Sequence, residues 1–82
     1  MEENRICVAA IIIDNPDSVQ EVNEALHKFS RLIVGRLGIP YRERGVAVIS
    51  VVLDGTTDDI SALTGKLGKI SGVTVKAAVS KK

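Results

Sequence analysis

The chain has 82 residues, which is enough for one domain, residues 1–82, and leaves its core near the lower limit for a lone chain. Eleven basic side chains nearly balance ten acidic ones, so no net charge draws the protein to nucleic acid or to an anionic membrane. A single cysteine, an amino terminus without a secretory signal and no apolar run near the ~20 residues that cross a bilayer predict a cytoplasmic protein without a membrane segment.

The first part of the chain predicts a strand followed by a helix. Residues 5–13, RICVAAIII, form a short run rich in β-branched side chains, which favours a buried strand. The helix has two candidate starts: Asn15 followed by Pro16, or Ser18 with Glu21 in a capping box. Apolar residues then recur at helical spacing, at Val19, Val22, Leu26 and Phe29, and Ile33 either continues this stripe or begins the next strand.

The rest of the chain predicts two more strands, a second helix and a final strand. A second strand lies within residues 33–39, and residues 46–53 form an unambiguous third strand. Thr56 or Thr57 then caps a helix whose apolar stripe is Ile60, Leu63, Leu67 and Ile70. Residues 73–79 alternate as a half-exposed strand should.

The glycines of the second helix have a structural interpretation. Gly68 and Gly72 offer positions at which the helix can stop. Gly65 and Lys66 lack the upstream glycine and the following Ser or Thr of a phosphate-binding loop. We therefore expect these glycines to let the helix pack closely on the sheet.

The resulting order, βαββαβ, predicts an α+β protein of the ferredoxin-like type. Right-handed crossovers place both helices on one face of a four-stranded antiparallel sheet. We expect the strand order 4-1-3-2, in which the first and third strands are central.

The face of this sheet that the helices leave open is predicted to be apolar. Both alternating sets of side chains in the first strand are apolar, and Val46, Val48 and Val52 lie on the less bulky face of the third strand. Polar residues return only toward the edges, at Thr74, Lys76, Ser80 and Arg36. An apolar centre with a polar rim is typical of a protein interface, so we expect a homo-oligomer, either a dimer or a tetramer, with Val46, Val48 and Val52 in the interface. The alternative is that a tail or loop covers these strands.

The same topology occurs in RNA-recognition domains, but the sequence does not favour RNA binding. Residues 44–51, RGVAVISV, follow the frame of the signature that such domains carry on their third strand. The positions of the stacking aromatics are filled by Val46, Val48 and Val51, and valine offers no π face to a base. The sequence therefore predicts no direct nucleic-acid binding.

Neither a catalytic constellation nor a metal cluster is visible in the sequence. Cys7 and His27 are the only soft metal ligands, and they fall in different elements, so no metal or cofactor is expected within one chain, while a site shared between subunits stays open. Asp58 and Asp59 lie where a helix amino terminus favours negative charge. Without a nucleophile and base pair, the sequence predicts a protein that is not an enzyme.

Two stretches, GRLGIPY at residues 35–41 and SALTGKLGKISGVTV at residues 61–75, together with most of the surrounding sequence, resemble the small family of iron-only hydrogenase system regulators. The resemblance implies an ACT-like domain that is oligomeric and similar in shape to the carboxy-terminal part of nickel-responsive repressors. The family takes its name from gene neighbourhood. The sequence departs from these relatives at both of their ligand sites. One histidine and one cysteine are too few for the nickel site of the repressors. Residues 14–17, DNPD, lack the glycine that is usual in amino-acid-binding ACT domains.

The stretch at residues 35–45 is the remaining candidate for a binding site. Arg36, Tyr41, Arg42 and Arg44 combine planar donors with an amphipathic ring and could bind a small anion or a protein partner. Alternatively the stretch is a hairpin connection whose arginines pair with the acids of residues 14–17. We expect a non-enzymatic, homo-oligomeric regulatory module that senses a small ligand or binds a partner, or alternatively a structural adaptor without a ligand.

Overall fold

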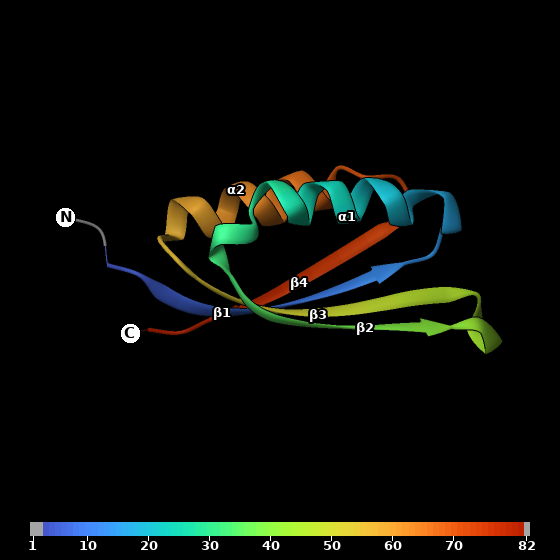
Figure 1. The fold of residues 1–82 in the computed structure, drawn as a ribbon, viewed down its shortest axis with the longest axis horizontal. Coiled ribbons are helices and arrows are strands. Elements are labelled where there is room, and N and C mark those ends of the chain that lie inside the picture. Colours follow the sequence, from blue (N-terminus) through green and yellow to red (C-terminus); the bar gives the residue numbers. More distant parts are fainter. Residues whose placement is uncertain (1–2, 82) are drawn as a thin grey trace.

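The computed structural model describes residues 3–81 and arranges them in two layers, a sheet and a pair of helices on one of its faces (Figure 1). Met1 and Glu2, on which the expected lack of a signal partly rests, lie outside the described residues, as does Lys82. The strands are β1 (Arg5–Ile13), β2 (Ile33–Tyr41), β3 (Val46–Gly55) and β4 (Val73–Val79). The helices are α1 (Val19–Lys28) and α2 (Thr57–Gly68), and the short 3-10 turns are η1 (Pro16–Ser18), η2 (Ser30–Leu32) and η3 (Arg42–Arg44).

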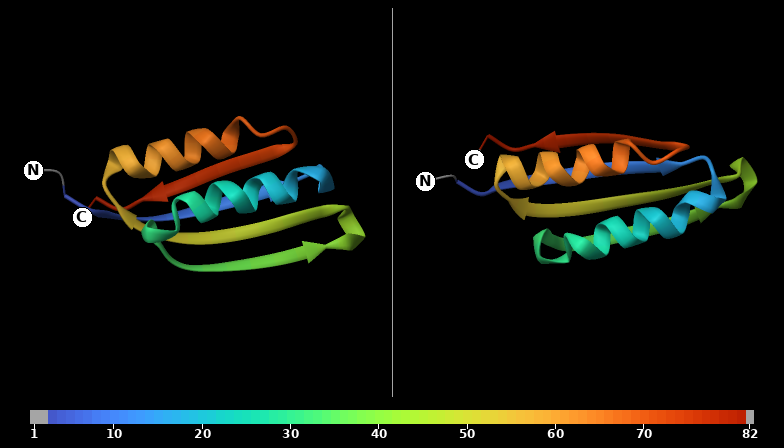
Figure 2. Two further views of the ribbon diagram at one scale, coloured as in Figure 1. Left: turned by 45° about the horizontal axis from the view of Figure 1, so that its top comes forward. Right: turned by 90° about the horizontal axis from the view of Figure 1, so that it is seen from above.

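The four strands lie in the order β2-β3-β1-β4, and all neighbours are antiparallel. This order is the predicted 4-1-3-2 read from the other edge, so the expected ferredoxin-like topology is confirmed. Figure 2 shows α1 over the β2 side of the sheet and α2 over the β4 side. One face of the sheet is thus covered, and the other carries no element of the described chain.

The core lies between the helices and the covered face of the sheet. In β1 every second residue is buried, and the register with β3 sets these residues beside the buried positions of that strand. Both predicted helical stripes point into this layer. The core consists of Cys7, Ala9, Ile11, Ile13, Val22, Ala25, Leu26, Leu32, Ile49, Val51, Leu53, Ile60, Leu63, Leu67 and Ile70.

The turn between β1 and α1 uses both candidate starts: Asn15 caps η1, and α1 begins after Ser18, which occupies the N-cap position but lacks the hydrogen bond of a capping box. The Asn15 side chain accepts a hydrogen bond of 3.0 Å from the backbone N–H of Asp17, and Pro16 opens η1. Ser18 makes no capping bond because its buried hydroxyl donates instead to the carbonyl of Ser71, at 2.6 Å. The Ser18 hydroxyl is therefore used in a contact with a residue distant in sequence and not in the helix cap that the local pattern predicts.

The turn between α2 and β4 packs against this first turn. The backbone N–H of Asp14 donates to the carbonyl of Gly72 at 2.7 Å. Gly72 has a left-handed φ of 74°, and a Cβ at this position would lie 2.7 Å from the Cβ of Asn15. Gly72 is therefore required both by its backbone conformation and by the close approach of its neighbour.

Gly65 does not have the packing role expected from the sequence. A Cβ added at Gly65 or at Gly68 would have no atom of the described chain within 4 Å, so neither glycine brings α2 closer to the sheet. Inside a helix, glycine costs about 1 kcal/mol relative to alanine because it loses more backbone entropy on folding.

Substitution Gly65→Ala is accordingly expected to raise the free energy of unfolding by about 1 kcal/mol, measured by urea denaturation monitored by circular dichroism. The reverse change at a neighbouring exposed position of α2, Ala62→Gly, is the matched control and should lower it by a similar amount. An unchanged or lower unfolding free energy for Gly65→Ala would contradict this account.

Candidate functional site

The open face is the surface of the sheet opposite the helices, and the strand registers fix its membership. Val8 pairs with Val52, Ile12 with Val48, and Ile39 with Val48 from the other side. Each of these rows continues across the sheet because paired residues point to the same side. The open face consists of Ile6, Val8, Ala10 and Ile12 on β1, Gly35, Leu37, Ile39 and Tyr41 on β2, Val46, Val48, Ser50, Val52 and, at the end, Asp54 on β3, and Thr74, Lys76 and Ala78 on β4.

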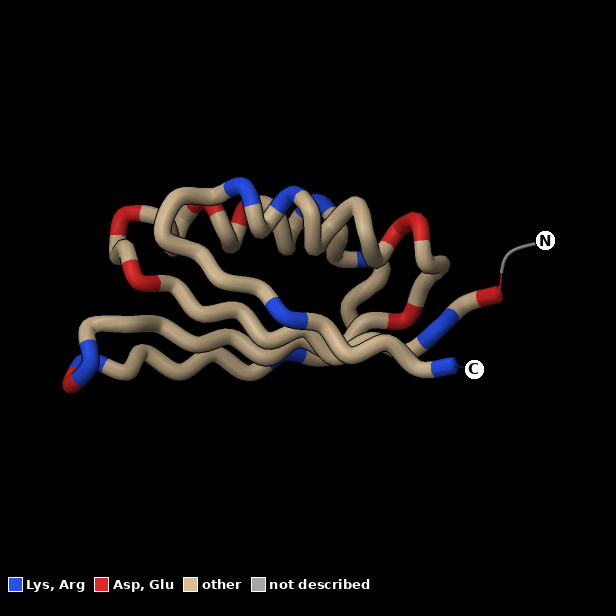
Figure 3. The backbone as a smooth tube through the Cα atoms, turned by 180° about the vertical axis from the view of Figure 1, so that it is seen from behind, with Lys and Arg blue, Asp and Glu red and all other residues tan. Residues whose placement is uncertain are grey.

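The open face is strongly apolar, as the sequence predicted. Val46, Val48 and Val52 are half-buried on it: Val48 and Val52 lie in the middle of the sheet, and Val46 lies beside the hairpin at the start of β3. Six of the eight large hydrophobic residues that the described chain exposes lie on it: Ile6, Val8, Ile12, Leu37, Ile39 and Tyr41. Figure 3 shows that charged positions gather on the helices and at the strand ends, with few along the middle of the sheet.

Arg36 does not belong to the rim of the open face, where the sequence placed it. A bulge between Ile33 and Gly35 shifts the register of β2, so that Arg36 pairs with the buried Val51 and lies on the helix side. There its guanidinium donates a hydrogen bond of 2.8 Å to the side-chain carbonyl of Asn23 on α1. Arg36 thus ties the edge strand to the helix.

The stretch at residues 35–45 is mostly strand rather than loop. Tyr41 pairs with Val46 and faces the open side, whereas η3 begins at Arg42, and Gly45 closes the turn with a left-handed φ of 68°. The structure therefore does not bring Arg36, Tyr41, Arg42 and Arg44 together into one site. The expected ion pairs are also missing: among residues 3–81 the one ion pair joins Arg31 to Asp59, at 3.9 Å.

Arg42 instead borders a small apolar hollow that is lined by residues from the end of β1, the start of the first helix and the β2–β3 hairpin. The hollow has a volume of about 310 Å³. Its lining includes Ile13, Pro16, Val19, Pro40, Arg42 and Ala47, and the hairpin adds Gly45 and Val46. Sequence reasoning singled out Arg42 but missed the apolar residues, because only the fold brings the two prolines opposite one another.

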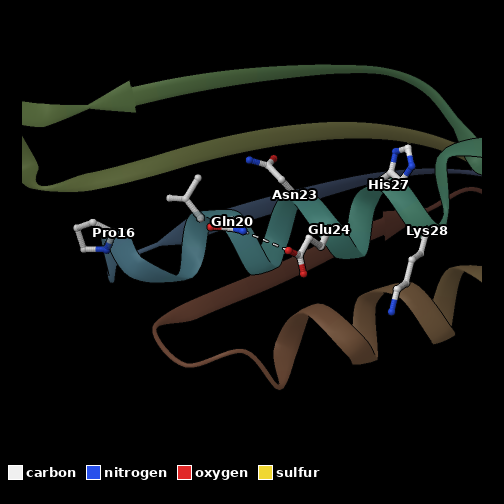
Figure 4. Close-up of a pocket in the computed structure, with 7 residues that line it drawn as sticks. Pro16, Gln20, Asn23, Glu24, His27 and Lys28 are labelled. Carbon is white, nitrogen blue, oxygen red and sulfur yellow. Dashed lines mark hydrogen bonds between the residues drawn. The ribbon is translucent and has the colours of Figure 1, made fainter.

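A larger but shallow depression of about 740 Å³ runs along the outside of α1 (Figure 4). Asn23 and His27 point toward the sheet side, and Glu24 and Lys28 point toward α2. Gln20 donates a hydrogen bond of 3.4 Å to Glu24 within the helix. The surface is a solvated helix face with both signs of charge.

The soft ligands and the acidic side chains lie apart from one another in the part of the chain that the structure describes. Within residues 3–81 no three His, Cys, Asp or Glu side chains come together as a metal-binding group. Cys7 is fully buried in β1, and burial raises the pKa of its thiol, which keeps it in the neutral, unreactive form. His27 lies on the exposed face of α1, away from Cys7.

The described helices are also too short and too polar for any of them to cross a bilayer.

Comparison with family models gives one match, over residues 5–77, to the TM1266-like family, described as "Iron-only hydrogenase system regulator, putative". A comparison with curated proteins finds no significant match. The uncharacterized protein TM1266 from Thermotoga maritima has a solved structure that is 45% identical in sequence. It superposes with a TM-score of 0.91, and the match covers 96% of this chain and 100% of that one.

More distant solved structures share the fold alone. The C-terminal domain of the MgtC protein from Mycobacterium tuberculosis is 15% identical with a TM-score of 0.75, over 99% of this chain and 93% of that one. The ACT domain from GTP pyrophosphokinase of Chlorobium tepidum is 17% identical with a TM-score of 0.71, over 96% and 89% of the two chains. The expected ACT-like architecture is therefore confirmed.

Proposed function

Because the chain belongs to the TM1266-like family of iron-only hydrogenase system regulators, we propose that it is a non-enzymatic regulatory module that works as a homo-oligomer and senses a small ligand or binds a partner. It acts as one domain in the cytoplasm, and copies associate through the open face. The apolar character of that face is the observation that carries the proposal.

Burial of the open face supplies free energy of the same order as the cost of association. Fully burying one large aliphatic side chain contributes ~1.5 to 3 kcal/mol, so the six exposed residues of the open face, each already partly covered, contribute on the order of 10 kcal/mol. The loss of translational and rotational freedom on association costs an estimated 4 to 15 kcal/mol. The gain is thus comparable with the cost for a dimer, and the area that would be covered includes Val48 and Val52 in the middle of the sheet and Val46 at its hairpin end.

Regulation rather than catalysis fits the chemistry of the surface. The described residues hold no cluster of metal ligands, and the buried thiol of Cys7 is neutral and shielded. Arg42, which is exposed on the hairpin and borders the apolar hollow, supplies donors for an anionic ligand or partner, and no residue of that lining could act on the bound group.

Association through the open face can be tested by substituting two valines that lie on opposite faces of the sheet. Val8 and Val79 are each 44% exposed, but Val8 lies on the open face, whereas Val79 pairs with Cys7 on the helix side. Val8→Asp should dissociate the oligomer, because a carboxylate in the contact would lose its hydration, and Val79→Asp should leave the oligomer intact. Sedimentation velocity over a range of protein concentrations measures both.

A wild-type protein that sediments as an 8.7 kDa monomer at all concentrations would overturn the association proposal. Equal dissociation by both variants would show that the open face is not the contact. Native mass spectrometry of the protein from cell extract then separates the two modes of regulation, since a small adduct supports ligand sensing and a retained foreign protein supports an adaptor.

A further inference from the structure

The hollow beside Arg42 is built from a row of residues that crosses three strands. Ala47 on β3 pairs with Ile13 on β1 and with Pro40 on β2, so these three side chains lie next to each other on the helix side of the sheet. Pro16 and Val19, from η1 and the first turn of α1, line the same hollow from the other layer. The two prolines give it stiff walls.

Arg42 is the charged residue of the lining, and it is free to bind. Within residues 3–81 it forms neither an ion pair nor a side-chain hydrogen bond, although Asp14 and Asp17 lie in the neighbouring turn. A guanidinium at the border of an apolar hollow matches a molecule with an apolar body and one anionic end, and its planar donors suit a carboxylate. The volume of about 310 Å³ is at the lower end for ligand sites, which limits the ligand to a small molecule.

The lining also argues against a zwitterion. No side chain that lines the hollow carries a hydrogen-bond acceptor, so an ammonium group held there would lose its hydration without compensation. An amino acid is therefore disfavoured relative to the same molecule without its amino group.

We propose that this hollow binds a small aliphatic monocarboxylate, with the apolar tail against Ile13, Val19 and Ala47 and the carboxylate held by Arg42. This proposal rests on the ligand-sensing function proposed above and names its ligand class. The site lies within one chain and shares only Val46, at the hairpin end of β3, with the open face, so binding and association can be measured independently.

The test compares three probes with the same branched carbon skeleton: 4-methylpentanoate, L-leucine, which adds an amino group, and 4-methylpentan-1-ol, which lacks the carboxylate. Each is titrated into the full-length protein and followed by amide chemical shifts in two-dimensional NMR. We expect 4-methylpentanoate to bind with a dissociation constant on the order of 1 mM and to shift the amides of Gly45 and Ala47. The other two probes should bind at least about tenfold weaker: the alcohol loses the charged contact with Arg42, and leucine keeps that contact but must strip water from its ammonium group.

Two arginine variants identify the contact. Arg42→Gln should weaken 4-methylpentanoate binding at least about tenfold, whereas Arg44→Gln, from the same turn but outside the lining, should leave it unchanged. Both side chains are exposed, so both variants should fold, which thermal unfolding verifies.

Equal losses in the two variants, equal binding of leucine, or no binding of the carboxylate would each overturn the proposal. So would binding of a peptide with an apolar carboxy-terminal residue by a protein that ignores the free acid, because the site would then recognise a protein partner. Sedimentation of the same samples keeps the two proposals apart: an intact oligomer without carboxylate binding refutes this ligand class alone.

Discussion

Replacing Gly72 with alanine is expected to remove roughly 3 kcal/mol from the free energy of unfolding, a large share of the ~4 to 12 kcal/mol typical of a domain of this size. Part of the loss arises from the left-handed φ of 74°, which costs a residue with a Cβ about 1 to 2 kcal/mol. The rest arises because the new Cβ would lie 2.7 Å from the Cβ of Asn15 and 3.1 Å from its backbone nitrogen. The turn after β1 and the turn before β4 must then move apart, which strains the hydrogen bond from the backbone N–H of Asp14 to the carbonyl of Gly72. Thermal and urea unfolding measure the loss.

Gly45→Ala is the matched control for this prediction. Gly45 has a similar φ of 68°, but a Cβ there meets nothing within 4 Å, so only the conformational cost applies. We expect a loss of about 1 kcal/mol at Gly45. If the two variants lose the same stability, the contact between Gly72 and Asn15 does not contribute.

Leu63→Ala should lower the free energy of unfolding by about 3 to 5 kcal/mol and leave much of the protein unfolded at physiological temperature. Leu63 is 0% exposed and lies on the buried stripe of α2 within the core. Its truncation removes apolar burial and leaves a cavity that a small, two-layer protein has little means to fill. Urea denaturation gives the change in the free energy of unfolding.

The same truncation at an exposed leucine of the open face, Leu37→Ala, is the control for Leu63→Ala. Leu37 is 62% exposed, so its truncation should change the stability of the isolated chain by less than about 1 kcal/mol. In concentrated samples the same variant should weaken association, because Leu37 lies on the open face. A large loss in dilute solution would mean that Leu37 is already covered within one chain.

Most of the fold could be predicted because local and long-range preferences agree along the chain. The bounds predicted for the first and last strands, residues 5–13 and 73–79, coincide with β1 and β4. All four residues of the predicted α2 stripe are buried, since the helical period and the apolar pattern select the same face. The apolar open face was also predictable, because alternation in a strand assigns each side chain to one of two sides.

The features that sequence reasoning missed depend on contacts between distant segments. The capping pattern at Ser18 is locally sound, but the hydroxyl bonds to Ser71, more than fifty residues away. Arg36 was assigned to the wrong face because an unseen bulge near Val34 inverts the alternation of β2. Gly65 was interpreted as a packing glycine, although the space around it is empty.

The candidate site was only partly predictable for the same reason. Tyr41 and Arg42 are adjacent in sequence, yet the strand continues to Tyr41 and sends the two side chains to opposite sides of the sheet. Arg42 was identified by its charge, whereas Pro16 and Val19 lie far from it in the sequence. Their proximity follows from the fold and not from any local pattern.

The bulge in β2 has a further consequence for the outer edge of the sheet. β2 is an edge strand whose unpaired backbone could recruit another chain and grow into a fibre. The bulge between Ile33 and Gly35 interrupts its ladder near one end, and Pro40, which has no N–H to donate, interrupts it near the other. Only a short regular segment is left as a template, so this edge is protected against amyloid-like extension even though its side chains are among the most apolar on the surface.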